Sequence, residues 1–433
     1  MRLIVLLLLA ALLALPAVAQ QPPGLYNLPG AQVVPSRSGT LAFTPRGRLL
    51  VVNPFGASVG VLNPVTRTLE AEIPVGQGPR AVALNADSTR ALVSNYGSGT
   101  VTLLDVPNAQ PLAEIAVGSL PWGVLIDARG VGYVALHGAA AIARVDLATG
   151  ALLEPIATPE QPAALALWGD YLYVTHFYGG TLSLIYLPQA RTVATLSLDG
   201  ALLASIEIDP RAALAYVPAT RLNDRLPGAA PDNRAVPIVE QIDLRLFRVL
   251  PEARLLLPVA DRAANLPFAV RLNAQRTRLL LAYAGSDAAA ELDLRSATAA
   301  AHFSVGAVPQ DLIFSRDASA IYVHNALDQT LSVIDARFYI PLDAVPTSAA
   351  ALPPALQIGA RLFHSASDAR LSPSQSLSCA TCHYGGLPDG RTWLGLNTPL
   401  LAGLPVDSSG WRGDFALNDH LRTFTGGAGL DDA

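Results

Sequence analysis

The feature that most constrains the fold is a block that recurs between residues 38 and 345. Its clearest copy runs from Gly78 to Gly118, and another runs from Val308 to Asp335. Each copy has four short stretches in which apolar and polar residues alternate, separated by turns with Gly, Asn or Asp, as half-buried β-strands require. One four-stranded sheet cannot bury both of its faces alone, so a repeat of this length predicts a β-propeller.

The spacing of polar residues within the block supports this unit. Asp105 lies ten residues after Asn95, and Asp335 lies ten residues after Asn325. The same offset recurs in three further copies, as Asn53 and Asn63, His176 and Tyr186, and Tyr283 and Asp293. A constant offset predicts a hairpin of constant length in each copy.

Prolines that we assign to turns mark the period. Pro79, Pro121 and Pro162 follow one another at nearly equal intervals, and Pro267 and Pro309 repeat the same interval. The longer gap from Pro162 to Pro267 fits two units and an insertion. Segment 221–237, rich in Pro, Gly, Asn and Asp, is that insertion, and we expect a surface loop there. Counting these repeat units along the chain predicts a propeller with seven blades.

The units resemble YVTN-type β-propeller repeats. The nearest matches are LYVTH at Leu172–His176 and IYVHN at Ile321–Asn325. The resemblance covers most of the chain, because it extends over all of the repeats. It implies the fold more than a function, because one fold hosts many functions.

Three histidines lie at or beside the ends of the second strands. His176 takes the repeat position of Asn95, and His137 and His324 each lie one residue from it. One hypothesis is that these histidines form a metal or ligand site on one rim of the propeller. No H-x-H, H-E-x-x-H or carboxylate cluster accompanies them, so we expect them to cap hairpins.

The N-terminus predicts export. Arg2 precedes an apolar run that Pro16 ends, and Ala17-Val18-Ala19 supplies the small residues of a cleavage site, so residues 1–19 are typical of a signal peptide. We therefore expect a periplasmic or secreted protein, with no membrane span in the mature chain. A formal net charge of −5 gives no indication of a nucleic-acid partner.

The only two cysteines lie in the stretch SCATCH, as Cys379 and Cys382, with His383 directly behind. C-x-x-C-H is the attachment pattern of haem c: two thiols on one turn add to the haem vinyl groups, and the histidine ligates the iron. A disulfide or redox dithiol is an alternative in an oxidising compartment but does not explain the histidine. Zinc would need two further ligands nearby.

The flanks of this motif resemble the N-terminal haem half of bacterial di-haem cytochrome c peroxidases and their MauG-like relatives. The matching segments are IGARLF, RLS, SCATCH, NTPLLAG and WRGDFALNDHL. The resemblance covers the last part of the chain and implies an acidic residue on the open side of the haem, for which Asp419 is the candidate. The family's second C-x-x-C-H is absent from this sequence, so we expect one covalent haem c.

The sixth iron ligand is not methionine, because Met1 is the only methionine and leaves with the signal peptide. The candidates are His364 and His420, or else the position is open to water and small ligands. Ligation by two histidines favours electron transfer, whereas an open position favours peroxide chemistry.

These observations predict four segments: a signal peptide at 1–19, a seven-bladed propeller at 32–343, a linker at 344–356, and a small, mainly α, cytochrome c-like domain at 357–433. We expect electron-transfer or peroxidase-like activity, with an electron-donor or electron-acceptor protein as partner. The propeller would then be a docking scaffold with a small-molecule or peptide ligand on its face. In the alternative, the propeller is an extracellular binding protein and the haem segment is vestigial.

Overall fold

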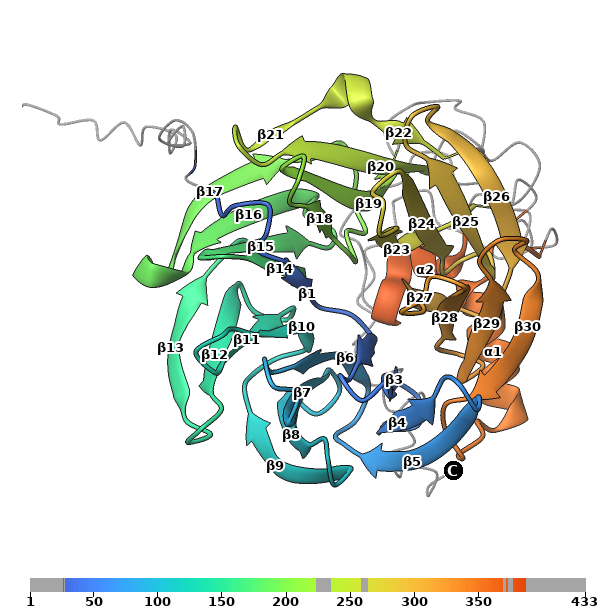
Figure 1. The fold of residues 1–433 in the computed structure, drawn as a ribbon, viewed down its shortest axis with the longest axis horizontal. Coiled ribbons are helices and arrows are strands. Elements are labelled where there is room, and N and C mark those ends of the chain that lie inside the picture. The colour runs from blue at the N-terminus through green and yellow to red at the C-terminus, as the bar shows by residue number, and fades with distance from the viewer. Residues whose placement is uncertain are drawn as a thin grey trace, which may run out of the picture.

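The computed structural model describes residues 26, 28–222, 235–257, 264–368, 371–372 and 377–386. Seven antiparallel sheets stand around a central axis, as Figure 1 shows. This confirms the predicted all-β propeller with seven blades. The predicted signal peptide and the candidates Asp419 and His420 lie outside the described residues.

The strands of each blade follow one another in sequence, from the axis outward. Blade 1 contains β2 (Leu41–Phe43), β3 (Leu49–Asn53), β4 (Ser58–Asn63) and β5 (Thr68–Pro74). Blade 2 contains β6 (Pro79–Leu84), β7 (Arg90–Asn95), β8 (Thr100–Asp105) and β9 (Gln110–Ala116). Blade 3 contains β10 (Pro121–Ile126), β11 (Val131–Leu136), β12 (Ala141–Asp146) and β13 (Leu152–Ala157). Blade 4 contains β14 (Pro162–Trp168), β15 (Tyr171–His176), β16 (Thr181–Tyr186) and β17 (Arg191–Ser197), with the short helix η1 (Leu187–Gln189) before β17.

The last three blades keep the same order. Blade 5 contains β18 (Glu207–Asp209), β19 (Leu214–Leu222), β20 (Ala235–Asp243), β21 (Arg248–Val249) and β22 (Leu255–Leu256), with η3 (Pro251–Ala253) between the last two. Blade 6 contains β23 (Pro267–Leu272), β24 (Arg278–Tyr283), β25 (Ala288–Asp293) and β26 (Thr298–Ser304). Blade 7 contains β27 (Pro309–Phe314), β28 (Ala320–Asn325), β29 (Thr330–Asp335) and β30 (Pro341–Pro346).

The predicted constant hairpin is confirmed. In blade 2, Asn95 ends β7 opposite Thr100, and Asp105 ends β8 opposite Arg90. In all five copies with the ten-residue offset, the two offset residues are the last residues of the second and third strands.

The repeated prolines lie elsewhere than predicted. Each is the first residue of an innermost strand rather than a turn residue, as in β6, β10, β14, β23 and β27. Proline suits this position because the start of an edge strand needs no amide donor. The residue before it has a positive φ, 59° at Gly78 and 55° at Val308, which turns the chain from one blade into the next.

The predicted insertion is shorter than expected. Strand β19 continues to Leu222 and β20 begins at Ala235, so both ends of segment 221–237 belong to a long hairpin. Apolar Val236 and Ile238 extend the alternating pattern of β20, which explains why the segment continues the sheet.

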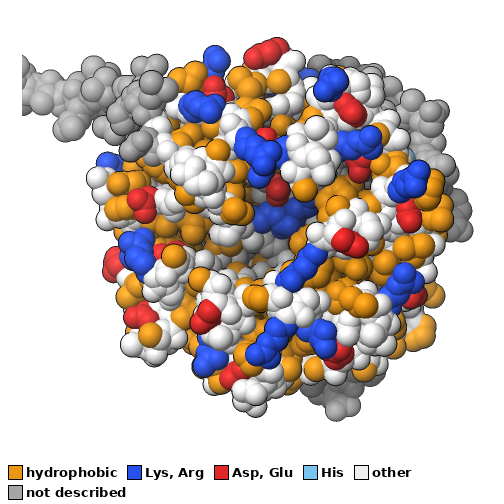
Figure 2. Space-filling view, viewed as in Figure 1, with side chains coloured by type: hydrophobic (Ala, Val, Ile, Leu, Met, Phe, Trp, Pro, Cys, Tyr) orange, Lys and Arg blue, Asp and Glu red, His pale blue; other side chains and the backbone are white. Residues whose placement is uncertain are grey.

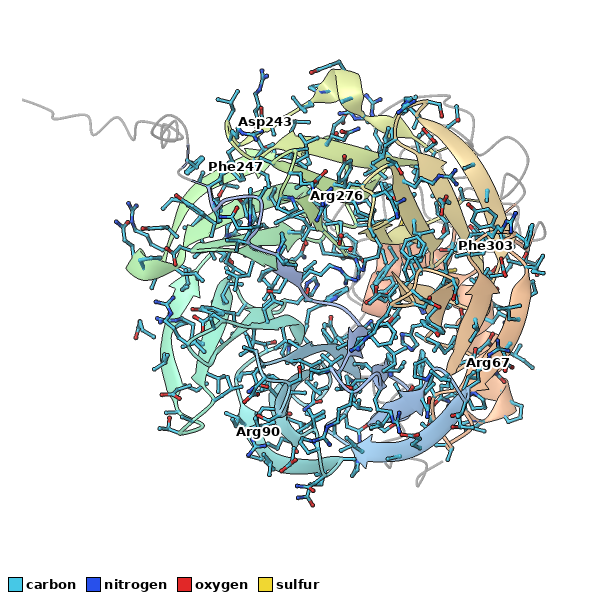
Figure 3. All side chains as sticks on the ribbon, viewed as in Figure 1. Arg67, Arg90, Asp243, Phe247, Arg276 and Phe303 are labelled. Atoms are coloured by element: carbon cyan, nitrogen blue, oxygen red, sulfur yellow. The ribbon has the colours of Figure 1, made fainter. Side chains whose placement is uncertain are left out.

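The apolar core lies between neighbouring blades. Leu92 of blade 2 and Val134 of blade 3 share one buried cluster, and each is 0% exposed. Comparable clusters join the other blades, which is how sheets that are apolar on both sides become buried. Side chains such as Arg67 and Asp243 lie near the outer rim (Figure 3).

The N-terminal segment crosses the centre of the ring before blade 1 begins. Strand β1 (Ser36–Arg37) pairs with the inner edge of β14 in blade 4. The hydroxyl of Ser38 then donates to the Leu165 carbonyl and accepts from the Leu165 amide, at 3.3 and 2.9 Å. Alternation in the sequence did not indicate this strand, because two residues are too few to show a pattern.

The ring closes without a strand shared between its first and last blades, since each is built from one continuous segment. Side chains make the connection instead. Asn53 of β3 donates to the Thr347 carbonyl at 2.8 Å and accepts from the Thr347 hydroxyl at 2.6 Å. At the outer rim, Arg67 lies 3.8 Å from Asp343.

Two helices follow the propeller, α1 (Pro354–His364) and α2 (Cys379–His383), and the short helix η4 (Tyr384–Gly386) ends the described chain. Among the described residues, we find no helix with the length and apolarity that a membrane crossing requires.

Replacing Asn53 tests the closure. Asn53→Ala removes both hydrogen bonds to Thr347, and both residues are 0% exposed, so water cannot replace them without a rearrangement. We expect the free energy of unfolding to fall by about 2–3 kcal/mol. Urea unfolding followed by circular dichroism measures this.

The control is Asn108→Ala. Asn108 is an exposed turn residue, and its side-chain amide donates a hydrogen bond to Asp105 within the same turn. We expect a change within about 0.5 kcal/mol. Equal losses in the two variants would contradict a special role for Asn53 in closure.

Candidate functional site

The C-x-x-C-H segment docks on one mouth of the central channel. Tyr384, directly after His383, is only 2% exposed. Its ring packs against Phe268, Phe177 and Trp122, at centroid distances of 5.1, 5.3 and 5.8 Å. These three aromatic residues come from three different blades, so Tyr384 lies at the point where the blades converge.

Polar contacts fix the orientation of Tyr384 inside this aromatic socket. Its amide donates to the Tyr178 hydroxyl at 2.8 Å, and its own hydroxyl accepts from Gln310 Nε2 at 2.9 Å. Burial raises the pKa of the Tyr384 phenol to about 12, so it stays neutral at physiological pH. The residue is therefore an uncharged anchor whose polar groups bond to the propeller.

The socket arises from the repeat itself. In β23, Pro267 pairs with Tyr283 and Ala269 pairs with Ala282, so Phe268 is the extra residue of a β-bulge. Arg80 and Gln310 occupy the same place after their prolines. A bulge redirects a side chain, and here the redirected side chains line the mouth of the channel.

These socket residues were not recognised from the sequence. The signal was nevertheless present, because each repeated proline is followed by a residue of the mouth, giving Arg80, Trp122, Ala163, Phe268 and Gln310. The residue after each repeated proline therefore identifies, from the sequence alone, the side chains nearest the axis in these five blades.

A second anchor holds the start of α2. The Asn265 side-chain oxygen accepts from the Ser378 hydroxyl at 3.2 Å, and its nitrogen donates to the Thr381 hydroxyl at 3.4 Å. Within the helix, the Ser378 amide donates to the Thr381 hydroxyl at 3.0 Å, which fixes the first turn. A Cβ at Gly285 would lie 1.9 Å from the Asn265 side-chain oxygen, so glycine is required for Asn265 to reach the helix.

Helix α2 has one side that packs against the propeller and one side that faces away from it. Ala380 and Thr381 are each 0% exposed and lie against the propeller. Cys379 and His383 are exposed, and Cys382 is half-buried. Residues at i, i+3 and i+4 share one side of a helix, so the two thiols and the imidazole lie together on the side away from the socket.

The chemistry of the cysteines bears on the three interpretations of the motif. The two sulfur atoms are not joined as a disulfide. Desolvation raises the pKa of the Cys379 thiol, whereas redox-active C-x-x-C thiols have lowered pKa values. Among the described residues, no group of three or more His, Cys, Asp and Glu side chains could hold a metal ion by itself.

His364, a candidate sixth ligand, lies at the end of α1. Its ring packs edge-on against Tyr384 at 5.8 Å and against Phe363 at 5.2 Å. Burial lowers the pKa of His364 to about 4, so its imidazole is neutral. Its contact with Tyr384 places the ring beside the socket, whereas the cysteines lie on the other side of α2.

The three histidines at or beside the ends of the second strands lie in separate environments. His176, the last residue of β15, contacts the Ser183 hydroxyl of the neighbouring strand β16 at 2.8 Å, as expected for a hairpin cap, and the Glu160 carbonyl before β14 at 2.9 Å. His324 instead contacts Thr40 Oγ1 at 2.8 Å and helps to close the ring. His137 packs on Trp122 at 4.8 Å, in the wall of the socket.

The tail makes more contacts with the propeller than a free linker would. Segment 344–356, predicted to be a linker, includes the end of β30 and the start of α1. Ser348 and the Ala349 amide both donate to the Glu72 carboxylate, at 2.6 and 2.8 Å, which lowers the pKa of Glu72. The first residues after the propeller are therefore tied to blade 1.

Comparisons with known proteins identify the fold. No family model and no curated protein matches the chain. Among solved structures, Kuenenia stuttgartiensis hydrazine synthase is 21% identical with a TM-score of 0.62, over 73% of this chain and 98% of that chain. Dihydro-haem d1 dehydrogenase NirN in complex with DHE is 19% identical with a TM-score of 0.50, over 72% of this chain and 67% of that chain. At these identities the likeness concerns the propeller fold.

Tyr384 variants test the docking. Tyr384→Ala empties the socket, and we expect a loss of about 3–5 kcal/mol in the free energy of unfolding, as for other buried aromatic residues. Tyr384→Phe removes the hydroxyl that bonds to Gln310, and we expect about 1 kcal/mol. Urea unfolding measures both, and limited proteolysis should cut the tail of Tyr384→Ala far faster than that of the wild type.

The control is Phe338→Ala, which removes an aromatic ring that is 61% exposed on the outer part of blade 7. We expect stability within about 0.5 kcal/mol of the wild type and unchanged proteolysis. If Tyr384→Ala behaved like this control, the socket would not hold the tail.

Proposed function

We propose that this chain is an exported haem c protein with electron-transfer or peroxidase-like redox activity. Cys379 and Cys382 hold one haem through thioether bonds, and His383 is the proximal ligand of the iron. The propeller is the scaffold on which the haem segment and an electron-donor or electron-acceptor protein dock. Residues 357–433 would form the cytochrome c-like domain, after the signal peptide at 1–19 has been removed.

The observation that carries this proposal is the division of α2 into two faces. The residues that would hold a haem lie on the side of α2 away from the propeller, and Ala380 and Thr381 between them are buried against the propeller. Neither thiol is used in a disulfide, and His383 is exposed and so accessible to an iron. The residues therefore fit haem c, which would supply one-electron redox chemistry when bound.

The contribution of the protein is to restrain the position of the proximal ligand, His383. The backbone of Tyr384 is held by Tyr178, and its ring is held by the aromatic socket. Because Tyr384 follows His383 directly, this anchor limits how far the proximal histidine can move. A rigid ligand restricts the reorganisation that accompanies a change of iron charge, which suits either electron transfer or peroxide chemistry.

The distal side depends on Asp419, which the family resemblance implies, and on the candidate sixth ligand His420. Asp419 would accept a proton from peroxide in an open site, as a general base. His420 would instead fill the sixth position in an electron carrier. The two are neighbours in sequence, so in a helix their side chains would diverge by about 100°.

The alternative function is that of an extracellular binding propeller whose haem segment is vestigial. The polar cavity in the central channel, lined by Arg80 and Arg271, favours a ligand-binding role of this kind. The name of one structural neighbour, dihydro-haem d1 dehydrogenase in complex with DHE, agrees with a propeller that works with a haem-type molecule.

Covalent haem is the first test. The full chain, exported from a host with c-type maturation, should keep its haem after denaturation and acid-acetone extraction, and should give a c-type pyridine haemochrome spectrum. Cys379→Ala combined with Cys382→Ala should abolish the retained haem. His383→Ala should retain it but change the spin state of the iron, because thioether bonds do not depend on the ligand.

His302→Ala is the matched control for His383→Ala, since His302 lies on the outer strand β26 of blade 6. We expect its haem spectrum to equal that of the wild type. Colourless protein from a maturation-competent host would reject the haem proposal and leave the alternative.

The state of the sixth ligand position of the iron distinguishes a peroxidase-like enzyme from an electron carrier. We expect an open site, so that the resting protein is high-spin and the reduced protein binds carbon monoxide rapidly and completely. Asp419→Asn should then slow peroxide turnover about 10²-fold or more without changing carbon monoxide binding. A low-spin spectrum untouched by carbon monoxide that becomes high-spin in His420→Ala or His364→Ala would instead show a carrier with two histidine ligands.

A further inference from the structure

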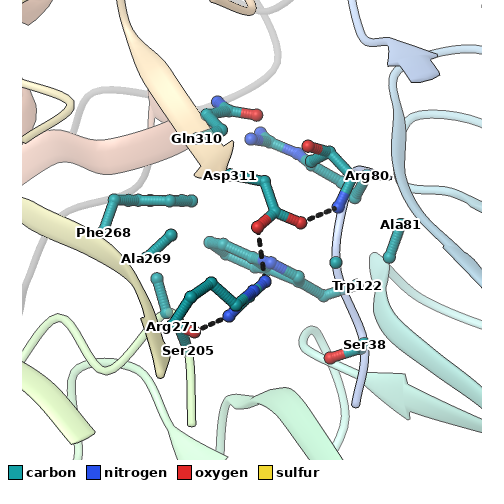
Figure 4. A pocket seen from close by; sticks show the side chains of 13 residues that line it. Ser38, Arg80, Ala81, Trp122, Ser205, Phe268, Ala269, Arg271, Gln310 and Asp311 are labelled. Atoms are coloured by element: carbon teal, nitrogen blue, oxygen red, sulfur yellow. Dashed lines mark hydrogen bonds and ion pairs between the residues drawn. The ribbon is translucent and has the colours of Figure 1, made fainter. Parts of the chain in front are cut away.

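A small polar cavity lies in the central channel directly under the aromatic socket (Figure 4). One face of the propeller is hollowed at its centre, with basic side chains around the hollow (Figure 2). The cavity has a volume of about 20 Å³ and is partly open to solvent, so it has room for a water-sized group rather than a cofactor. Its polar lining includes Arg80, Ser205, Arg271, Gln310 and Asp311.

Arg271 lines this cavity and has a buried donor without a partner among the described residues. Its side chain is buried, with Arg271 only 4% exposed, and its terminal nitrogens contact the Ser205 hydroxyl at 3.2 Å and the Asp311 carboxylate. Its Nε is buried without a hydrogen-bond partner among the described residues. A buried unpaired donor on a charged group is costly, so its presence indicates a missing acceptor.

Arg80 adds a second cation. Its guanidinium lies 4.7 Å from the ring centre of Tyr96 and 5.1 Å from that of Trp122. No carboxylate among the described residues forms an ion pair with it, although other arginines near the axis have one. Its charge is therefore offset by the faces of aromatic rings rather than by an anion.

The nearby carboxylate of Asp311 already accepts from other donors. Its Oδ2 accepts from the Thr40 amide at 2.9 Å, and its Oδ1 accepts from Arg271. A Cβ at Gly39 would lie 2.3 Å from Asp311 Oδ2, so the backbone itself closes around this carboxylate.

Glu207 lies 3.1 Å from Arg37, and it also faces Arg271, Arg276 and Asp311. Burial raises the pKa of Glu207 to about 7, although Arg37 opposes the shift.

We propose that this cavity, the channel site, binds a small monovalent anion between Arg80 and Arg271, such as a halide or a carboxylate of the size of formate. Arg271 Nε is the donor that lacks an acceptor, and Arg80 supplies the second positive charge. A larger anion does not fit because the cavity has room only for a water-sized group. The proposal goes beyond the redox function and does not depend on haem.

Sodium bromide and sodium formate are the probes. Crystals of the full chain soaked in bromide should show an anomalous peak within hydrogen-bonding distance of Arg271. Isothermal titration with formate should show one saturable site, and the haem spectrum recorded alongside reports separately on any anion at the iron. Arg80→Met keeps apolar contact with the rings, and we expect it to weaken formate binding about tenfold or more.

Arg191→Gln, an exposed arginine on the outer strand β17, is the control and should leave formate affinity unchanged. Arg80→Lys keeps the charge and should recover part of the affinity. Absence of a bromide peak from the channel, or equal formate binding in Arg80→Met and the wild type, would overturn the proposal. Neither result bears on covalent haem, so failure of one proposal does not imply failure of the other.

Discussion

The carboxylate of Asp311 joins the two ends of the propeller at its axis, where it accepts hydrogen bonds from the Thr40 amide before blade 1 and from Arg271 in blade 6. Closure matters because the apolar faces of the blades are buried only by their neighbours. No strand is shared between the first and last blades, so side chains and the crossing segment at β1 make the connection. Val51 of blade 1 and Val333 of blade 7 share one buried apolar cluster, which completes the same interface.

The start of the innermost strand in blades 2, 3, 4, 6 and 7 is the second organising element. A residue with positive φ, a proline and a bulge follow one another there, and the bulge directs the side chain after the proline to the axis. Repetition of this backbone plan with a different side chain in each blade gives Arg80, Trp122, Phe268 and Gln310 around one mouth. The repeat thus supplies a uniform frame, and the residue after the proline gives the mouth its aromatic and polar character.

Tyr384 joins the proposed haem segment to that frame. It is buried beside Trp122 and directly follows His383, so the proximal side of the proposed haem is attached to the rigid part of the molecule. The channel site lies under the same tyrosine. The two proposed sites have separate ligand chemistry and separate tests.

Local sequence determined the seven blades, their strand order and their hairpin register, because alternation and turn spacing report on neighbours only a few residues apart. The C-x-x-C-H spacing also predicted that the thiols of Cys379 and Cys382 lie on one turn, but it did not predict which side of α2 packs against the propeller. The positions of Arg271, Asp311 and Glu207 in one channel were decided only by closure of the ring, which brings together residues from three different blades. Likewise, the local sequence Tyr384-Gly385-Gly386 does not predict that the Tyr384 ring is buried near the propeller axis. Its aromatic partners come from separate blades and converge only when the propeller is complete.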